Sequence, residues 1–205
     1  MNRLVAERGR VVGVERSDGA RQPSDVAIVT AGAWTASLLA GLGARLPLIT
    51  RPLQMLLTEP APIELAPVVG CFDRKLSLKQ LADGAYLIGG GWPARIADHE
   101  ANRWEVLDDS VKGSLEVAGE VCPALTGCKL AARWAGLEAF TPDELPVIGP
   151  VPSVEGVVVA AGFSGHGFAL SPVVGDVLAR LALGRDALPP LWRDLRFDRP
   201  TLAGS

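Results

Sequence analysis

Two short and continuous apolar runs, one near each end of the chain, set strong limits on the fold. Residues 26–30 read Val-Ala-Ile-Val-Thr, and residues 157–161 read Val-Val-Val-Ala-Ala. A run of this length without polar alternation is typical of a strand that is buried on both faces, as in a parallel sheet. Each run leads through small residues into a helical stretch. We therefore expect both ends of the chain to build one α/β lobe together.

The middle of the chain has a pattern that is typical of antiparallel strands. Leu76–Lys79 and Tyr86–Ile88 flank the turn residues Ala82-Asp83-Gly84, which predicts a β-hairpin. In residues 103–121, apolar residues recur at steps of three and four, which predicts an amphipathic helix that ends before Pro123. The expected fold class is α/β in the broad sense (α+β), with an antiparallel lobe inserted into the first lobe.

We expect residues 1–45 and 131–205 to form the α/β lobe, and residues 46–130 to form the antiparallel lobe. The remaining predicted elements are a hairpin at 4–14, strands at 53–57 and 129–134, an irregular loop at 141–152, and a last helix that reaches Leu183 and is closed by Gly184.

Charge and cysteine content exclude several classes of protein. The formal net charge is -3, from 20 Lys and Arg and 23 Asp and Glu, without a basic block of the kind that nucleic-acid binding needs. No apolar run reaches the ~18 residues of a membrane span, and the start has no secretory signal, so we expect the cytoplasm. Three cysteines fit no zinc pattern and indicate reduced thiols, with a disulfide between Cys122 and Cys128 left open. We expect no metal site.

The first candidate binding motif follows the first apolar run. Ala31, Gly32 and Ala33 precede Trp34 at the point where the strand turns into a helix. Small residues there allow backbone to approach a flat ligand closely, although tight packing of strand against helix would need them too.

The second candidate motif follows the second apolar run. Three glycines within six residues precede the last helix, in a spacing that is not the G-x-G-x-x-G pattern. The backbone N–H groups of a helix start favour negative charge, so this loop is a candidate binding segment, and a purely structural turn is the alternative. Its residues are Gly162, Phe163, Ser164, Gly165, His166, Gly167 and Phe168.

A third segment, at 133–149, contains Trp-Ala-Gly-Leu-Glu followed by Thr-Pro-Asp and Leu-Pro. This dense turn chemistry indicates a shaped loop, which could equally be a rigid connection.

The order of the three motifs resembles the D-amino-acid-oxidase-like FAD enzymes. That family includes glycine oxidase, sarcosine oxidases, D-amino-acid dehydrogenases, and the flavin subunits of opine, hydroxyproline and proline dehydrogenases, which the motifs resemble most. The hairpin at 80–90 and the ending Leu-Arg-Phe-Asp-Arg-Pro at 195–200 are also similar to the family.

The resemblance implies FAD as cofactor and an amine or amino-acid derivative as substrate, with partner subunits in multi-subunit relatives. The carbon next to nitrogen would lose a hydride to the flavin, giving an imine. Ala31–Trp34, Gly136 and the loop Gly162–Phe168 would lie against the flavin. The substrate side would be lined by Gln54, Ser77, Trp92 and Glu138. No residue stands out as a general base.

Two residues depart from the family pattern. Several relatives carry Arg where this chain has Glu138, and that Arg clamps the substrate carboxylate in a two-pronged hydrogen bond. Those oxidases place a substrate-facing Tyr roughly where this chain has Ser77. An orientation of Glu138 into solvent is the alternative to a role in substrate choice.

Family members also begin with a strand and a G-x-G-x-x-G turn that holds the FAD pyrophosphate. The chain shows no such sequence, so we expect roughly half of an ordinary family member to be absent from it. The alternative function is therefore a truncated or non-catalytic subunit that only completes the flavin site of another chain.

Overall fold

The structure is a computed structural model that describes residues 3–71, 73–98, 103–185 and 189–202. The chain forms two compact units: unit 1 is Met1–Thr50 with Glu138–Ser205, and unit 2 is Arg51–Leu137. The division falls within two strands, β5 (Ile49–Thr58) and β11 (Leu130–Phe140). The assignment of one unit to the flavin and of the other to the substrate is a proposal.

A three-stranded sheet with the order β12–β13–β4 forms the centre of unit 1. β13 (Val157–Ala161) is buried along its whole length and runs parallel to β4 (Ala27–Val29), as the apolar runs predict. β12 (Val147–Pro150) pairs antiparallel with β13. The prediction of an irregular loop through this stretch is therefore wrong, because Val147 and Ile148 are buried strand residues.

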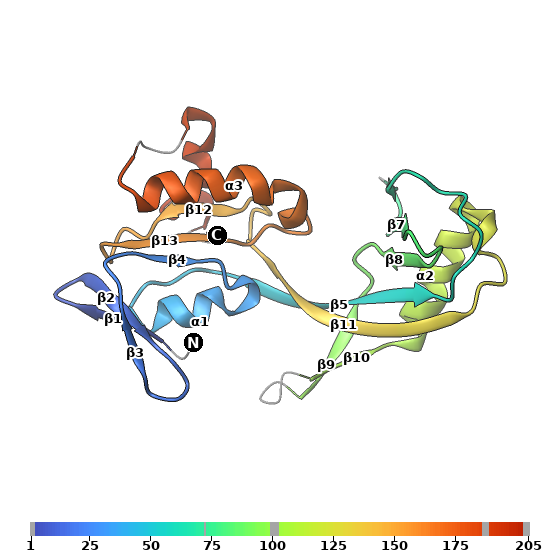
Figure 1. The fold of residues 1–205 in the computed structure, drawn as a ribbon, viewed down its shortest axis with the longest axis horizontal. Helices are drawn as coiled ribbons and strands as arrows, with labels where there is room; N and C mark the ends of the chain where they lie inside the picture. Colours follow the sequence, from blue (N-terminus) through green and yellow to red (C-terminus); the bar gives the residue numbers. More distant parts are fainter. Residues whose placement is uncertain (1–2, 72, 99–102, 186–188, 203–205) are drawn as a thin grey trace. The chain divides into compact units, whose positions relative to one another are not determined.

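Each face of this sheet is covered by a different layer. The helix α3 (Gly167–Ala182) packs on one face, where Val158 and Ala160 of the sheet meet Val174 and Val177 (Figure 1). The other face packs against α1 and an N-terminal sheet, in a core that includes Leu4, Val11, Leu39, Val29 and Val159. The covering elements are β1 (Arg3–Glu7), β2 (Arg10–Glu15), β3 (Arg21–Pro23) and α1 (Thr35–Ala40).

β4 departs from the expectation of a strand buried on both faces. Ile28 is 46% exposed, while Ala27 and Val29 on the opposite face are buried. Among the described residues, β4 pairs with β13 alone and is therefore an edge strand. An edge strand with an exposed apolar side chain is open to pairing with a further strand.

Unit 2 contains a five-stranded sheet with the order β11–β5–β8–β7–β6. The predicted hairpin is confirmed as β7 (Ser77–Gln80) and β8 (Tyr86–Gly89), with Leu78 opposite Ile88. Leu56, Leu78 and Ile88 form a core with residues of α2. The remaining elements are β6 (Val69–Gly70), a β9–β10 pair (Ala94–Asp98 and Arg103–Val106), α2 (Asp108–Val121) and the 3₁₀ turn η2 (Pro123–Leu125).

The predicted helix at 103–121 starts five residues too early. Residues 103–106 pair with β9 as a strand, and Leu107 is extended before the helix begins at Asp108. Asp108 and Asp109 stand in the first turn, where negative charge is favourable, and they mark the helix start. The apolar period that suggested a longer helix includes Trp104, whose burial is decided by strand pairing instead.

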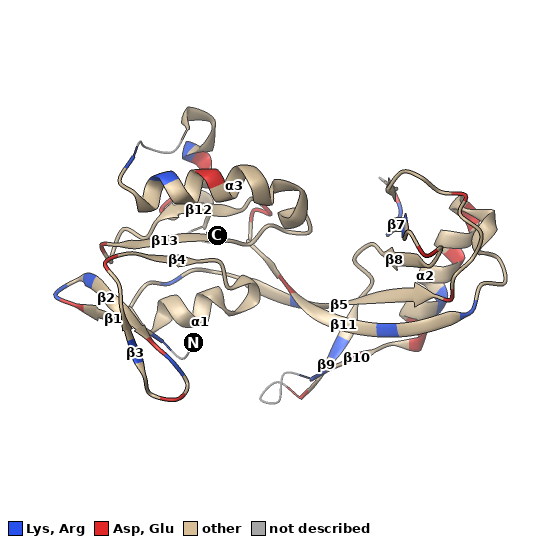
Figure 2. Cartoon of the chain, viewed as in Figure 1, with Lys and Arg blue, Asp and Glu red and all other residues tan. Residues whose placement is uncertain are grey.

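Charged residues of both signs are interspersed along both units (Figure 2). The first half of α3 carries no charged residue. No helix in the described part of the chain is both long enough and apolar enough to cross a membrane. Within the same residues, no group of three or more His, Cys, Asp or Glu is placed to hold a metal ion.

Candidate functional site

Three segments of unit 1 meet at one edge of its central sheet. β4 and β13 are parallel with Val29 opposite Val159, so the residues that follow each strand emerge at the same edge. β12 is antiparallel with Val147 opposite Ala161, so the loop that precedes β12 reaches this edge as well. In open α/β sheets, ligands bind outside the carboxyl ends of the parallel strands. This edge is therefore the candidate site.

The segment after β4 is the predicted motif Ala31–Trp34. Gly32–Trp34 form a 3₁₀ turn, η1, before α1 begins. Gly32 has φ +53, and the space where its Cβ would lie has no protein atom within 4 Å. The glycine therefore serves backbone conformation and not packing within the described chain. The indole of Trp34 is half exposed.

The segment after β13 is the predicted loop Gly162–Phe168. Gly162, Ser164 and Gly165 all have positive φ, and the backbone N–H of His166 donates to the carbonyl of Phe163, so the loop folds back tightly. α3 then begins at Gly167 without a side-chain cap and without an acidic residue in its first turn. The first N–H groups of a helix have no partner within it. They are available here to an electron-rich ligand edge.

Glu138 lies beside this loop. Its Oε1 is 3.6 Å from the position that a Cβ of Gly165 would take. The end of β11 holds this arrangement, because the N–H of Ser164 donates to the carbonyl of Ala139 and Phe140 bridges Phe163. Glu138 is half-buried. This position does not support an orientation into solvent away from the loop.

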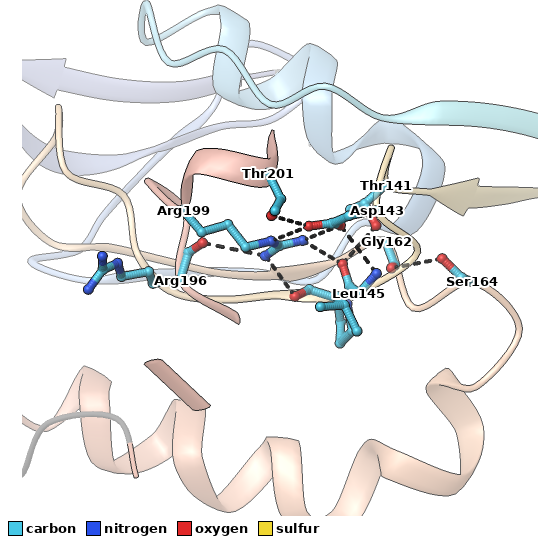
Figure 3. A network of polar contacts seen from close by, with 9 residues as sticks. Thr141, Asp143, Leu145, Gly162, Ser164, Arg196, Arg199 and Thr201 are labelled. Carbon is cyan, nitrogen blue, oxygen red and sulfur yellow. Dashed lines mark hydrogen bonds and ion pairs between the residues drawn. The ribbon is translucent and has the colours of Figure 1, made fainter. Parts of the chain in front are cut away.

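The segment before β12 is held by a cluster of polar contacts that the sequence analysis did not predict (Figure 3). The Arg199 guanidinium donates to both carboxylate oxygens of Asp143, at 2.7 and 2.8 Å, and also to the carbonyls of Leu145 and Pro146. Arg199 is only 4% exposed. The Thr201 hydroxyl donates to the same carboxylate. The turn residues Thr-Pro-Asp indicated a shaped loop, but nothing in the sequence paired Asp143 with a residue 56 positions away.

The electrostatics of this pair favour the charged state. The hydrogen bonds from Arg199 hold the pKa of Asp143 well below its usual range, against the opposing effect of partial burial. Thr201 and the amide of Leu145 act in the same direction as Arg199. A buried pair of this kind is sensitive to the loss of one partner, which typically costs about 3–5 kcal/mol.

The other predicted substrate-side residues belong to unit 2, and packing occupies two of them. Gln54 is buried and its amide nitrogen donates to the carbonyl of Ser110 at 2.9 Å. Trp92 donates its indole N–H to the carbonyl of Lys75, and its ring lies against Gly113 of α2. The indole N–H of Trp92 and one N–H of the Gln54 amide are therefore engaged, whereas the Gln54 Oε1 makes no hydrogen bond within the described residues.

Ser77 and Gly136 are the exposed members of the predicted set in unit 2. Ser77 lies opposite Gly89 on the sheet face that is turned away from the α2 core, and the Met55 thioether lies over Gly89, 2.7 Å from where a Cβ would be. Gly136 has no protein atom within 4 Å of its Cβ position. Arg133, the cation nearest in sequence to Glu138, forms an ion pair with Asp108 at 2.7 Å.

A family model described as FAD dependent oxidoreductase matches residues 2–181. Glycine oxidase of Pseudomonas putida is 32% identical over 185 residues, which cover 90% of this chain and 48% of that protein. Sarcosine oxidase subunit beta of Rhodobacter capsulatus is 31% identical over 176 residues, or 85% of this chain and 41% of the relative.

Two solved structures are similar to the chain in fold. The crystal structure of L-proline dehydrogenase from P. horikoshii has a TM-score of 0.79 and 27% identity, covering 92% of this chain and 50% of that one. The crystal structure of iminodiacetate oxidase from Chelativorans sp. BNC1 has a TM-score of 0.77 and 26% identity, covering 93% and 50%. The chain spans about half the length of the relatives that it matches. It belongs to the family of FAD-dependent oxidoreductases, whose cofactor is FAD.

Proposed function

We propose that this chain supplies the flavin-edge and substrate-facing parts of an enzyme that oxidises an amine or an amino-acid derivative with FAD. The observation that carries the proposal is the meeting of Ala31–Trp34 and Gly162–Phe168 at the carboxyl ends of two adjacent parallel strands. Both motifs have the small residues and helix starts that are typical of ligand-binding segments, and the parallel pairing of β4 with β13 supports a shared role.

The residues at this edge fit a flavin. The start of α3 is uncapped and free of acidic residues, so its N–H groups favour an electron-rich ring edge. No protein atom lies within 4 Å of the Cβ position of Gly32, so a flat ring could approach the backbone there. When bound, FAD supplies the acceptor for the hydride that leaves the carbon next to nitrogen. The chain's own contribution would be orientation and electrostatics.

Glu138 supports a substrate with a positive group. Its carboxylate beside Gly165 would repel a substrate carboxylate and attract an ammonium or a basic side group. Among the described residues, no cation forms an ion pair with Glu138, and Arg133 is engaged by Asp108. Basic amino-acid derivatives such as opines are therefore the proposed substrate class, with Ser77 on the substrate side. A cytoplasmic location remains part of the proposal.

The second candidate is a subunit that completes the flavin site of another chain without catalysing alone. One observation favours it: within the described structure β4 has an unpaired edge, to which a strand of another chain could pair. The name of one relative, sarcosine oxidase subunit beta, shows that a related chain acts as a subunit. Such a subunit would still place Gly162–Phe168 against the flavin.

The visible absorbance spectrum of the purified chain, recorded after gel filtration with added FAD, tests whether this chain holds FAD by itself. We expect weak retention or none, because no pyrophosphate-binding turn is present in the sequence. That result is expected of a chain that supplies only part of a flavin site and needs a further segment or another chain to hold FAD. Stoichiometric FAD with a protein-bound spectrum would instead support an enzyme that is complete in this chain. If FAD at any concentration left the amide hydrogen exchange of Gly162–Phe168 unchanged, both candidates would be contradicted.

A further inference from the structure

Arg199 is a buried cation far from both ligand motifs in sequence. It lies just before the short 3₁₀ turn η4 (Pro200–Leu202), and its side chain is 4% exposed. The guanidinium satisfies its donors with the Asp143 carboxylate and the carbonyls of Leu145, Pro146 and Arg196 (Figure 3). All but one of these hydrogen bonds go to a single loop, and a planar fork used in this way is a geometric constraint on that loop, which lysine cannot reproduce.

The loop that Arg199 holds is the turn Thr141–Pro146. Asp143 is fixed by Arg199 and Thr201, and it also accepts from the N–H of Leu145 at 3.3 Å. The hydroxyl of Thr141 donates to the Leu145 carbonyl at 2.7 Å, so the same turn fixes the Thr141 side chain. Glu144 has φ +59, a conformation that these surrounding bonds hold.

Thr141 passes this constraint to the candidate flavin loop. It is 1% exposed, and its Cγ2 lies 2.5 Å from the position that a Cβ of Gly162 would take. Gly162 has φ +70 and therefore begins the loop in a conformation that favours glycine. Close contact on one side and the left-handed backbone on the other leave the chain little freedom at this point. A shift of the Thr141 side chain would therefore displace the backbone at Gly162 as well.

We propose that Arg199 is a positioning residue that sets the loop Gly162–Phe168 through Asp143 and Thr141. The inference rests on the proposed function in so far as that loop faces the flavin. The C-terminal segment is then a clamp on the ligand edge of the sheet. In this proposal Arg199 acts on the loop only through Asp143 and Thr141, and does not itself contact the ligand.

Hydrogen–deuterium exchange of the 205-residue chain tests the clamp directly. In Arg199→Lys the charge remains but the fork is lost, so amides in 162–168 should exchange on the order of tenfold faster through local opening. Amides of the β1–β2 hairpin should keep their wild-type rates. Arg196→Lys is the matched control: among the described residues, the Arg196 side chain forms an ion pair only with the exposed Asp198, so this change should leave the loop unaffected.

Thr201→Val covers the case in which Arg199→Lys fails to fold. It removes one donor to Asp143 and leaves Arg199 in place. Amide exchange in the loop should therefore accelerate by a smaller factor, while amides elsewhere keep their wild-type rates. Unchanged exchange in the loop for every variant that folds would overturn the proposal. Equal acceleration in the loop and in the β1–β2 hairpin would also overturn it, because that pattern indicates general destabilisation.

Adding millimolar FAD to the exchange experiment separates the clamp from the proposed function. FAD should slow exchange of 162–168 in the wild type, and should slow it less in Arg199→Lys because the loop is no longer set for the ligand. If FAD leaves the wild-type loop unaffected while Arg199→Lys still loosens it, the clamp stands and the flavin assignment is wrong. If FAD protects wild type and Arg199→Lys equally, Arg199 has no positioning role.

Discussion

Glu138 places a carboxylate beside Gly165, in the loop that leads into α3. In a complete enzyme that carries this half, Glu138→Gln should lower kcat/KM for a cationic amine and spare a neutral one, because one close charge contact is lost. The expected cost is about 1–3 kcal/mol for the cationic substrate alone. Glu155→Gln, at the opposite end of β13, is the control and should change neither value. Equal effects on both substrates would remove Glu138 from the site.

Tyr86 is the only tyrosine of the chain and is fully buried, with a hydroxyl that makes no hydrogen bond within the described residues. Burial raises the pKa of this phenol, and the nearby Cys122 thiol adds to the effect. The phenol of Tyr86 ionises near pH 10 in the unfolded chain, whereas the folded chain still keeps it neutral there. The free energy of unfolding should therefore fall as the pH rises above about 10.

Tyr86→Phe should therefore remove part of the alkaline loss of stability. At neutral pH the variant should be equal to or more stable than the wild type, since an unpaired buried hydroxyl costs about 1–3 kcal/mol. Urea unfolding at pH 7 and at pH 10.5–11 measures both effects, with the pH values chosen around the ordinary phenol pKa of about 10. Absorbance of the folded wild type near 295 nm provides the check, because a phenol that ionises at its ordinary pKa would contradict the burial of Tyr86.

At the scale of elements, α2 contains two glycines with opposite expected effects. A Cβ on Gly113 would lie 2.3 Å from the Cη2 atom of Trp92, so Gly113→Ala forces this ring to move. Overpacking of this kind costs about 1–3 kcal/mol, which outweighs a gain in helix propensity of up to about 1 kcal/mol. Gly119 has open space at its Cβ position, so Gly119→Ala should stabilise the helix. Urea midpoints that shift in the same direction for both variants would contradict this packing.

At the scale of the whole molecule, exposed apolar surface should make the isolated chain associate. Ile28 is 46% exposed on the edge strand β4, and Phe168 is 95% exposed at the start of α3. Such edges and patches promote pairing with other chains. Light scattering after gel filtration, together with binding of an apolar dye, should show oligomers that Ile28→Thr reduces. Ile63→Thr, an exposed loop residue of unit 2, is the matched control. A monomeric wild type without dye binding would contradict the prediction.

Local sequence signals determined the elements whose formation depends on few neighbours. The apolar run at 157–161 is β13, the turn residues Ala82-Asp83-Gly84 join β7 to β8, and Gly184 closes the last helix with φ +65. Apolar runs, turn residues and helix-closing glycines act within a few positions of themselves, so they can be recognised without a structure. The family motifs were visible in the same way, because each is a contiguous string.

Only the tertiary structure decided features that depend on residues distant in sequence. Residues 103–106 form a strand because β9 pairs with them, although their period suits a helix. The ring of Trp92 lies where a Cβ of residue 113 would be, which explains the glycine in α2. The hydrogen bonds of Arg199 hold the Thr141–Pro146 turn. The last contact joins side chains 56 positions apart, and its strength comes from burial and two-pronged geometry. Neither quantity exists before the chain has folded, which is why composition and spacing did not reveal it.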